Sequence, residues 1–412
     1  MAKKTNKTET NSATDEFFDQ LIGQQNAIEP GAAVLGDEMF AEVKKWSSTG
    51  SSILNTIISN SKDGGWPCGR VVELYGEEAI GKSTLVYAAM ADCQRQGGIP
   101  IFFDIEQAGA KNVMVACGVD LKRLVYSGLT EMEKIFQALE KNLQAIIENP
   151  IYQDKPVIVC MDSLAQMSTE QEVEADYEHN MNMSLRKAQQ LGKALRKIVP
   201  FLNKANACLI VINQQRDKPG VMFGDPKTTP GGNALKFAAT LRIKLKGAQA
   251  VVLMDPVAQA EYETALSKYD VDVEKWKSND KVGAKPIKPK KEDFKGDKII
   301  VGYDVEAFTV KNKVGPPKRS ANFRIMFGQG IVEEEAWFDY ALKFGIVHKV
   351  GKEYEFLGIK NDAGKFSRDS WLSVLADAEL REKVKDLVVE KMIRPLDGGI
   401  PVVTSDEAAE QD

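Results

Sequence analysis

The chain has 412 residues, 43% of them apolar, and carries a formal net charge of −5 at pH 7. This length and apolar content can supply buried cores for two or three domains. The acidic balance excludes nucleic-acid binding through overall charge, so any such site must be local. The five cysteines form no CxxC pair, which is typical of reduced thiols in a cytoplasmic protein, and two histidines, His179 and His348, argue against a histidine-based metal site. The sequence has no apolar N-terminal run and no stretch of eighteen apolar residues, so neither a signal peptide nor a membrane span is expected.

The N-terminal segment reads as a tail followed by one helix. Residues 1–13 are polar and are expected to be disordered. The stretch TDEFFDQLIGQQNAIEPG, residues 14–31, predicts a helix whose apolar face carries Phe17, Phe18, Leu21 and Ile22. A single helix cannot bury its own apolar face, so this one must pack on the core or on a partner.

From about Trp46 to Leu245, short apolar runs alternate with helical stretches. The runs are GRVVELYG, IPIFFDIE, KPVIVCMD and ACLIVINQ. They are rich in Val and Ile and lack polar alternation, which is typical of strands buried on both faces of a parallel sheet. Helices such as GKSTLVYAAMADCQRQ and SLRKAQQLGKALRKIVPFLNKA lie between them. The pattern predicts an α/β doubly wound core with a mostly parallel sheet flanked by helices.

The second half of the chain departs from this rhythm. Residues 247–298 are expected to form an insertion with a short helix, DPVAQAEYETALSKY, and then an exposed, largely irregular stretch from Lys275 to Lys298 with nine lysines against four acidic residues. Strand-like KIIVGYDVEAFTVKNKV and SANFRIMFGQG then return to the core. The predicted divisions are 1–45 for the tail and N-terminal helix, 46–332 for the core with its insertion, 333–404 for a small C-terminal domain and 405–412 for an acidic tail.

The run GEEAIGKS matches GxxxxGK[ST] in full and stands between a predicted buried strand and a helix, the context that this phosphate-binding loop requires. Its backbone N–H groups and the helix N-terminus favour a bound phosphate chain. Lys82 is expected to reach the β- and γ-phosphates and Ser83 to hold Mg²⁺. The alternative, an ordinary glycine-containing turn, is disfavoured by the flanking elements. The residues predicted to contact the nucleotide here are Gly76, Glu77, Glu78, Ala79, Ile80, Gly81, Lys82, Ser83 and Thr84.

Three polar residues stand at the ends of predicted buried strands: Glu106, Asp162 and Gln214. The carboxyl ends of parallel strands line one crevice, so these side chains should converge on the phosphate loop. We expect Asp162 to hold the Mg²⁺ shell, Glu106 to orient the attacking water and Gln214 to sense the γ-phosphate. For each residue alone, a polar strand cap is an equally good interpretation.

Two long loops follow these strands. The first lies after Asp162 and carries Met181 and Met183; the second, QRDKPGVMFGDPKTTPGGNALKF, follows Gln214. Glycines allow close backbone approach, and basic residues with apolar wedges suit single-stranded nucleic acid. On composition, a lid over the nucleotide competes evenly with this interpretation. The residues of the second loop predicted to bind DNA are Arg216, Lys218, Gly220, Val221, Met222, Thr229, Gly231, Gly232 and Asn233.

Five blocks of the sequence resemble, in order, the signature motifs of the bacterial RecA recombinases. They are GEEAIGKSTL, FFDIEQA, VIVCMDS, INQQRDKPGVMFGDPKTTPGGNALKF and VKNKVGPPK. The resemblance covers about Trp46 to Gly330, interrupted by the insertion, and continues weakly to the acidic tail. Its most specific part is the run from Gly220 to Phe237, because a generic phosphate-loop enzyme does not need it. The degree of divergence resembles that of a bacteriophage-encoded member acting in the host cytoplasm.

The resemblance implies a RecA-like ATPase core and a DNA-dependent ATPase, an ATP hydrolase using ATP and Mg²⁺. It implies a filament on single-stranded DNA that exchanges strands with homologous duplex DNA and holds ATP between adjacent protomers. By this resemblance Lys311 and Lys313 reach the neighbour's γ-phosphate as catalytic residues beside Glu106 and Lys82. It also implies that Gln214 links the phosphate to the DNA loop, that Phe223 contacts the neighbour and that the N-terminal helix docks on the next protomer.

The sequence departs from the family at two places. Val113 stands where an aromatic residue commonly stacks on adenine, and Ala110 replaces an acidic residue nearby. Glu306 and Phe308 stand where the family has basic residues for the second DNA strand. We hypothesise that the lysine-rich insertion takes over that role; a solubilising or disordered insertion is the alternative.

Other functions remain open at this point. A ring ATPase of helicase or regulatory type shares the fold, because fold alone does not decide function. A DNA-coating protein without useful turnover is opposed by the presence of Lys82, Glu106, Asp162 and Lys311. A small-molecule kinase would give the glycine- and proline-rich loop and the VKNK block no purpose.

Overall fold

The structure is a computed structural model that describes residues 17, 19–25, 27, 43–174, 182–217, 227–279, 281–294, 296–359 and 364–394. The chain divides into two units, residues 1–44 and 45–412. In the first unit residues 17 and 19–25 are helical, and the side chains of Phe17 and Leu21 are exposed. The predicted tail of residues 1–13 and the acidic residues 405–412 lie outside the described parts. Among the helices that can be assessed, none is long and apolar enough to cross a membrane.

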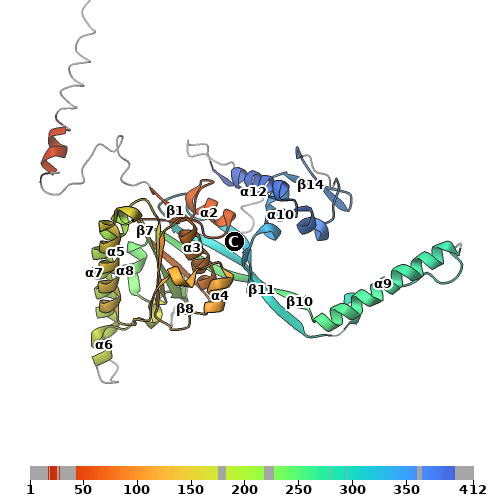
Figure 1. The fold of residues 1–412 in the computed structure, drawn as a ribbon, viewed down its shortest axis with the longest axis horizontal. Helices are drawn as coiled ribbons and strands as arrows, with labels where there is room; N and C mark the ends of the chain where they lie inside the picture. Colours follow the sequence, from red (N-terminus) through yellow and green to blue (C-terminus); the bar gives the residue numbers. More distant parts are fainter. Residues whose placement is uncertain are drawn as a thin grey trace, which may run out of the picture. The chain divides into compact units, whose positions relative to one another are not determined.

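A nine-stranded sheet forms the centre of the second unit (Figure 1). In spatial order its strands are β13 (Gly330–Val332), β12 (Ser320–Met326), β11 (Lys298–Asn312), β10 (Leu241–Met254), β3 (Val71–Gly76), β7 (Ala207–Gln214), β6 (Val157–Asp162), β4 (Ile99–Asp104) and β5 (Val125–Ser127). The pairs from β10 to β5 are parallel, whereas β11, β12 and β13 pair antiparallel. The mostly parallel sheet confirms the predicted fold class. One strand differs from its prediction, since β4 ends at Asp104 and leaves Glu106 in the following turn.

Helices cover both faces of this sheet. On one face α2 (Ser52–Ser59), α3 (Lys82–Arg95) and α4 (Lys111–Ala116) pack in one apolar cluster. On the other, α5 (Met132–Glu148), α7 (Asn182–Lys204) and α8 (Gly232–Ala238) pack in a second. The apolar spacing explains the packing of α5, because Ile135, Leu139, Leu143 and Ile146 recur on one helical face and are buried. The sheet is therefore enclosed where its parallel strands are longest.

Smaller elements connect these layers. β1 (Trp46–Ser47) pairs with β2 (Trp66–Pro67), and β8 (Arg216–Asp217) pairs with β9 (Lys227–Thr228) at the base of the second loop. Short helical segments are α6 (Glu170–Glu174), η1 (Leu121–Arg123), η2 (Pro150–Tyr152), η3 (Leu164–Gln166), η4 (Lys291–Asp293) and η5 (Arg368–Ser370).

The insertion is more regular than predicted. β10 and β11 continue as an antiparallel ribbon out to the pair Met254 and Lys298, and α9 (Pro256–Ser278) follows the ribbon. The expected helix therefore extends nine residues further than DPVAQAEYETALSKY and includes Lys275 and Lys277. Asp255 caps it by accepting hydrogen bonds from the backbone N–H groups of Val257 and Ala258. In Figure 1 the ribbon leads directly from the sheet into α9.

The C-terminal part contains α10 (Glu334–Lys343), β14 (Val347–Val350), β15 (Glu353–Phe356), α11 (Trp371–Val374) and α12 (Ala378–Met392). Trp371 is fully buried in its centre, with the rings of Phe338, Phe356 and Phe366 within 5.2–5.8 Å. These residues belong to the same apolar cluster as α2 and α3. This part is therefore joined to the main sheet through a continuous core.

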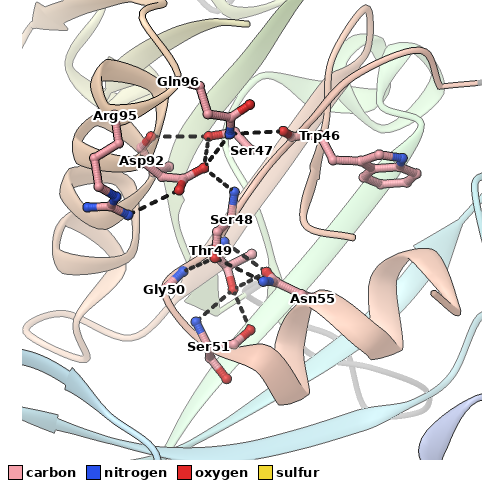
Figure 2. A network of polar contacts seen from close by, with 11 residues as sticks. Trp46, Ser47, Ser48, Thr49, Gly50, Ser51, Asn55, Asp92, Arg95 and Gln96 are labelled. Carbon is pink, nitrogen blue, oxygen red and sulfur yellow. Dashed lines mark hydrogen bonds and ion pairs between the residues drawn. The ribbon is translucent and has the colours of Figure 1, made fainter. Parts of the chain in front are cut away.

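A polar network holds α3 against the segment that precedes α2 (Figure 2). The Asp92 carboxylate accepts hydrogen bonds from the Ser48 N–H at 2.7 Å and the Ser47 hydroxyl at 3.1 Å. It also binds the exposed guanidinium of Arg95 at 3.0 Å. The Asn55 side chain accepts from the Thr49 N–H at 2.8 Å. The network therefore fixes the helix that follows the phosphate loop.

We expect Asp92→Ala to lower the free energy of unfolding by about 1–3 kcal/mol, because it leaves the half-buried Ser48 N–H without its acceptor. The buried Ser47 hydroxyl loses one of its two acceptors and keeps the Ala89 carbonyl at 3.2 Å. Arg95→Ala is the matched control and should cost about 0–1 kcal/mol, since the pair it breaks is exposed. Urea unfolding of both variants measures the difference. Equal losses in the two variants would contradict this account of the network.

Candidate functional site

The phosphate loop joins the end of β3 to the start of α3. Ala79 (φ +56°) and Gly81 (φ +93°) lie in the left-handed backbone region. The positive φ of Gly81 favours glycine, and an added Cβ would stand 2.1 Å from Ile325 Cδ1, so the end of that side chain would have to shift. The Lys82 ammonium is buried and donates hydrogen bonds to the carbonyls of Gly76, at 3.4 Å, and Glu77. Burial lowers the pKa of Lys82, and the carboxylates of Asp162 and Glu106 oppose that shift.

A cavity of about 340 Å³ adjoins the loop, and residues 79–84 form one wall. Val113 lies in the lining, where the family places an aromatic residue. Tyr303 and Phe327 supply aromatic surface to the same cavity, with ring centroids 5.8 Å apart. Sequence reasoning missed this pair. The register that places Tyr303 opposite Ile325, two residues before Phe327, becomes visible only from the pairing of β11 with β12.

The strand-end residues predicted from the sequence do converge. The Ser83 hydroxyl donates a hydrogen bond of 2.8 Å to Asp162 Oδ2. Burial raises the pKa of Asp162 to about 6, against the opposing effect of the Ser83 hydrogen bond. Glu106 Oε1 accepts hydrogen bonds from the Ser163 hydroxyl and from Gln214 Nε2, the latter at 3.4 Å. Four predicted residues therefore form one connected polar edge.

Two residues that support this edge were not predicted. Ser163, which holds Glu106, directly follows Asp162 and is 1% exposed. Asp104 shapes the turn that carries Glu106, because its carboxylate accepts from the N–H groups of Ala108 (3.2 Å) and Gly109 (2.9 Å) and from the Tyr126 hydroxyl (2.8 Å). Asp104 had a sequence signal, as an acidic residue at the end of a buried strand. The role of Ser163 depends on the pairing of β4 with β6.

A buried polar chain connects the middle of the sheet with the second loop. Glu73 in β3 is fully buried and pairs with Arg242 Nε at 2.5 Å. Asn213 Nδ2 donates to Glu73 Oε1 at 3.1 Å and to the Pro230 carbonyl at 3.0 Å, next to Gly231. The only signal in the sequence is a glutamate inside the apolar run RVVELYG. The chain ties the end of the loop to the strand that leads into the phosphate loop.

The predicted DNA-binding residues are covered only in part. Met181, Lys218, Gly220, Val221 and Met222 lie outside the described residues, as does Phe223, and for Met183 and Arg216 only the backbone is described. Gly231 (φ +91°) and Gly232 (φ +62°) begin α8, and Asn233 beside them is exposed. Thr229 is 5% exposed, and within the described structure its hydroxyl has no hydrogen-bond partner. Its buried side chain is therefore closed to a nucleic acid in this conformation.

Lys311 and Lys313 lie away from their own phosphate loop. Lys311 is opposite Arg242 in the register of β10 and β11, and its ammonium donates to the carbonyls of Lys236 (2.8 Å) and Phe237 (3.3 Å) at the end of α8. The apolar face of α8 packs with α7, whereas α3 covers the opposite face of the sheet. Burial and the neighbouring Lys313 lower the pKa of Lys311. The site of one protomer therefore does not include these lysines.

The family model for the RecA N-terminal domain matches residues 22–277. A Protein RecA from Bacteroides thetaiotaomicron is 33% identical over 384 residues, which cover 92% of this chain and 96% of the relative. A Protein RecA from Francisella tularensis subsp. novicida is 32% identical over 330 residues, or 80% of this chain and 77% of the relative. The chain belongs to the RecA family. This confirms the resemblance seen in the motifs. Both relatives are bacterial, and the phage origin stays a prediction.

The RecA match contains the phosphate loop, the three strand-end residues and both predicted DNA loops. It ends inside α9, so Lys311, Lys313 and the C-terminal part lie beyond the matched domain. For this RecA family member, the roles of the individual residues therefore rest on the geometry described above, and the part played by the two lysines is a proposal.

Proposed function

We propose that this chain is a DNA-dependent ATPase and recombinase that forms ATP-dependent filaments on single-stranded DNA. In this proposal it pairs that DNA with a homologous duplex and exchanges strands. The observation that carries the proposal is the connected edge of Ser83, Asp162, Glu106 and Gln214, which stands where the phosphate loop and the second predicted DNA loop both begin. A nucleotide bound at the Ser83 end of this edge can therefore be sensed by Gln214 at the other end.

The residues fit ATP with Mg²⁺. Oxygen donors are the ligands that Mg²⁺ prefers, and the Ser83 hydroxyl and Asp162 carboxylate lie 2.8 Å apart. When bound, Mg²⁺ would neutralise phosphate charge during transfer. Lys82 now donates to loop carbonyls and can turn to the β- and γ-phosphates. Tyr303 and Phe327 offer apolar surface to the base in place of the missing aromatic residue at Val113.

Glu106 is the residue that we assign to orient the attacking water. Ser163 and Gln214 hold its carboxylate, and Gln214 makes only a long contact of 3.4 Å. A γ-phosphate would offer the Gln214 amide a charged acceptor, and such bonds are stronger than neutral ones. Differential contact of this kind can shift the loop after Gln214 between two states. Hydrolysis would reverse the shift.

The position of Lys311 supports a site shared between protomers. Within one protomer the lysine bonds to the end of α8, away from the phosphate loop. If a neighbouring protomer places its phosphate loop against this surface, Lys311 and Lys313 of the first protomer complete the neighbour's ATP site. Such an interface joins two different surfaces, and repetition of it builds an open filament or a closed ring.

The test is the ATPase rate of the purified chain with and without single-stranded DNA at two salt concentrations. We expect a large stimulation by DNA that weakens at higher salt, as binding to phosphates requires. The Lys82→Ala variant is the control that assigns the activity to this protein. A rate indifferent to DNA would contradict the proposal. Closed rings of fixed size in electron micrographs, rather than filaments, would favour a ring ATPase.

A further inference from the structure

The inserted ribbon leaves the sheet at the edge that carries the candidate site. β10 runs parallel to β3 and loses it as a neighbour after Leu245, which is opposite Gly76 at the start of the phosphate loop. Beyond that point β10 pairs only with β11, and β11 pairs with β12 no further out than Gly302. The ribbon therefore starts from the carboxyl edge of the parallel strands, as do both predicted DNA loops.

The arm, residues 252–300, separates its charges along the chain. The first part of α9, residues 256–274, has five acidic residues and one lysine. The segment that follows, residues 275–298, is named the basic segment here. Its described residues include three acids, Glu292, Asp293 and Asp297, against eight lysines: Lys275, Lys277, Lys281, Lys285, Lys288, Lys290, Lys291 and Lys298. The positive charge is thus concentrated in the second half of the arm.

Most lysines of the basic segment are available to a ligand, and Lys291 lies over the Tyr262 ring at 5.8 Å from its centroid. All eight are exposed, and none forms an ion pair with any residue that the structure describes. Elsewhere on the surface Lys134, Lys197 and Lys385 each pair with a glutamate. Lys285, Lys288 and Lys290 lie in a stretch without helix or strand that contains Pro286 and Pro289. Uncompensated lysines on an extended chain are typical of a contact with a polyanion.

The chemistry of the segment favours duplex over single-stranded nucleic acid. Unstacked bases need exposed aromatic rings, and the aromatic residues here are engaged within the arm. The Trp276 indole donates to the Gly283 carbonyl at 3.1 Å, and the rings of Tyr262 and Phe294 pack edge-on at 5.5 Å. Lysines instead recognise phosphates as point charges. Duplex DNA presents one such charge per about 1.7 Å of helix axis.

Two apolar side chains in the basic segment do not indicate a protein partner by themselves. Val282 is 69% exposed and Ile287 is 90% exposed. They are separated along the chain by Lys285 and Pro286, and singly exposed apolar residues are common on soluble proteins. The unpaired charge is therefore the dominant feature of this surface.

We propose that the basic segment binds the phosphate backbone of duplex DNA and holds the second DNA molecule on an arm that starts from the carboxyl edge of the sheet. This inference rests on the proposed function, in which that edge holds the single strand. The acidic first part of α9 would repel DNA and confine the contact to the basic segment. The basic segment, of which residues 278–298 lie beyond the matched RecA domain, thus supplies a second, sequence-independent DNA site.

The test compares the full-length chain with Lys285→Gln, Lys288→Gln and Lys290→Gln combined in one variant. The control combines Lys122→Gln, Lys141→Gln and Lys204→Gln, which remove the same charge from other exposed positions. Fluorescence anisotropy of a labelled short duplex is measured over a salt series. We expect the arm variant to bind duplex at least about tenfold more weakly, with a salt slope smaller by about 2–3. The control should bind like the unchanged protein.

Several outcomes would overturn the inference. Equal duplex affinity and salt slope in the arm and control variants would remove the arm from DNA binding. An equal loss for a labelled single strand would deny it a duplex-specific role. A changed sedimentation of the DNA-free protein with unchanged duplex binding would show a contact between copies instead. The measurement does not depend on hydrolysis, so a lack of ATPase stimulation by single-stranded DNA contradicts the proposed function without deciding this one.

Discussion

Replacing Lys311 by alanine is expected to lower the DNA-stimulated ATPase rate by about 10³-fold, by analogy with cations supplied across an interface to a transferring phosphoryl group. The affinity for nucleotide in the absence of DNA should stay within about threefold, because Lys311 lies away from its own phosphate loop. Steady-state hydrolysis and binding of a fluorescent ATP analogue measure the two effects separately. A rate within tenfold of the unchanged protein would contradict a catalytic role for this lysine.

The control for Lys311 must account for its present contacts. Its ammonium bonds to two carbonyls at the end of α8, so alanine also removes a helix cap worth about 1 kcal/mol. Lys311→Arg keeps the charge, and thermal unfolding of both variants shows the cost of the cap. Lys313→Ala, measured separately, tests the second lysine. If the rates of the Lys311→Ala and Lys311→Arg variants fall with their thermal stability and do not depend on the charge at position 311, Lys311 serves only to cap α8.

Replacing Glu106 by glutamine is expected to lower hydrolysis by about 10²–10⁴-fold, the range for loss of a general base. ATP and single-stranded DNA should still bind, because the amide keeps the shape of the side chain and its contact with Ser163. The variant should therefore stay on DNA longer after ATP is added. Glu140→Gln is the matched control, since this carboxylate pairs with Lys197 on the surface.

Ser163→Ala should lower the hydrolysis rate less than Glu106→Gln does, because Ser163 acts only through the position of Glu106.

Much of this site could be predicted because its signals are local. The phosphate loop is one contiguous motif, and β3, β6 and β7 are buried on both faces, which leaves mainly apolar runs that Glu73 interrupts in β3. Glu106, Asp162 and Gln214 follow such runs, and parallel strands bring their ends together. The short strands β5 and β13 have three residues each, which is too few for a periodic signal.

What could not be predicted depends on neighbours in space. The contact of Ser163 with Glu106, the pair of Tyr303 and Phe327 and the contact of Asn213 with Glu73 all require the strand order and register. α9 was expected to be short because it is mostly exposed, with Ala258 as its one buried residue among those described, so it lacks an apolar stripe to mark its length. The ribbon could not be predicted either, because its two strands, β10 and β11, are separated in the sequence by the insertion.

In the proposed filament a neighbouring protomer completes each ATP site, and mixing two inactive variants tests this arrangement. The Lys311→Ala variant keeps Glu106, and the Glu106→Gln variant keeps Lys311. An interface in which the first variant supplies the phosphate loop and the second supplies the lysine therefore contains Glu106 and Lys311. On single-stranded DNA an equimolar mixture should recover about a quarter of the unchanged rate, since random assembly creates that interface about one time in four. A mixture no faster than its two components measured apart would contradict the shared site.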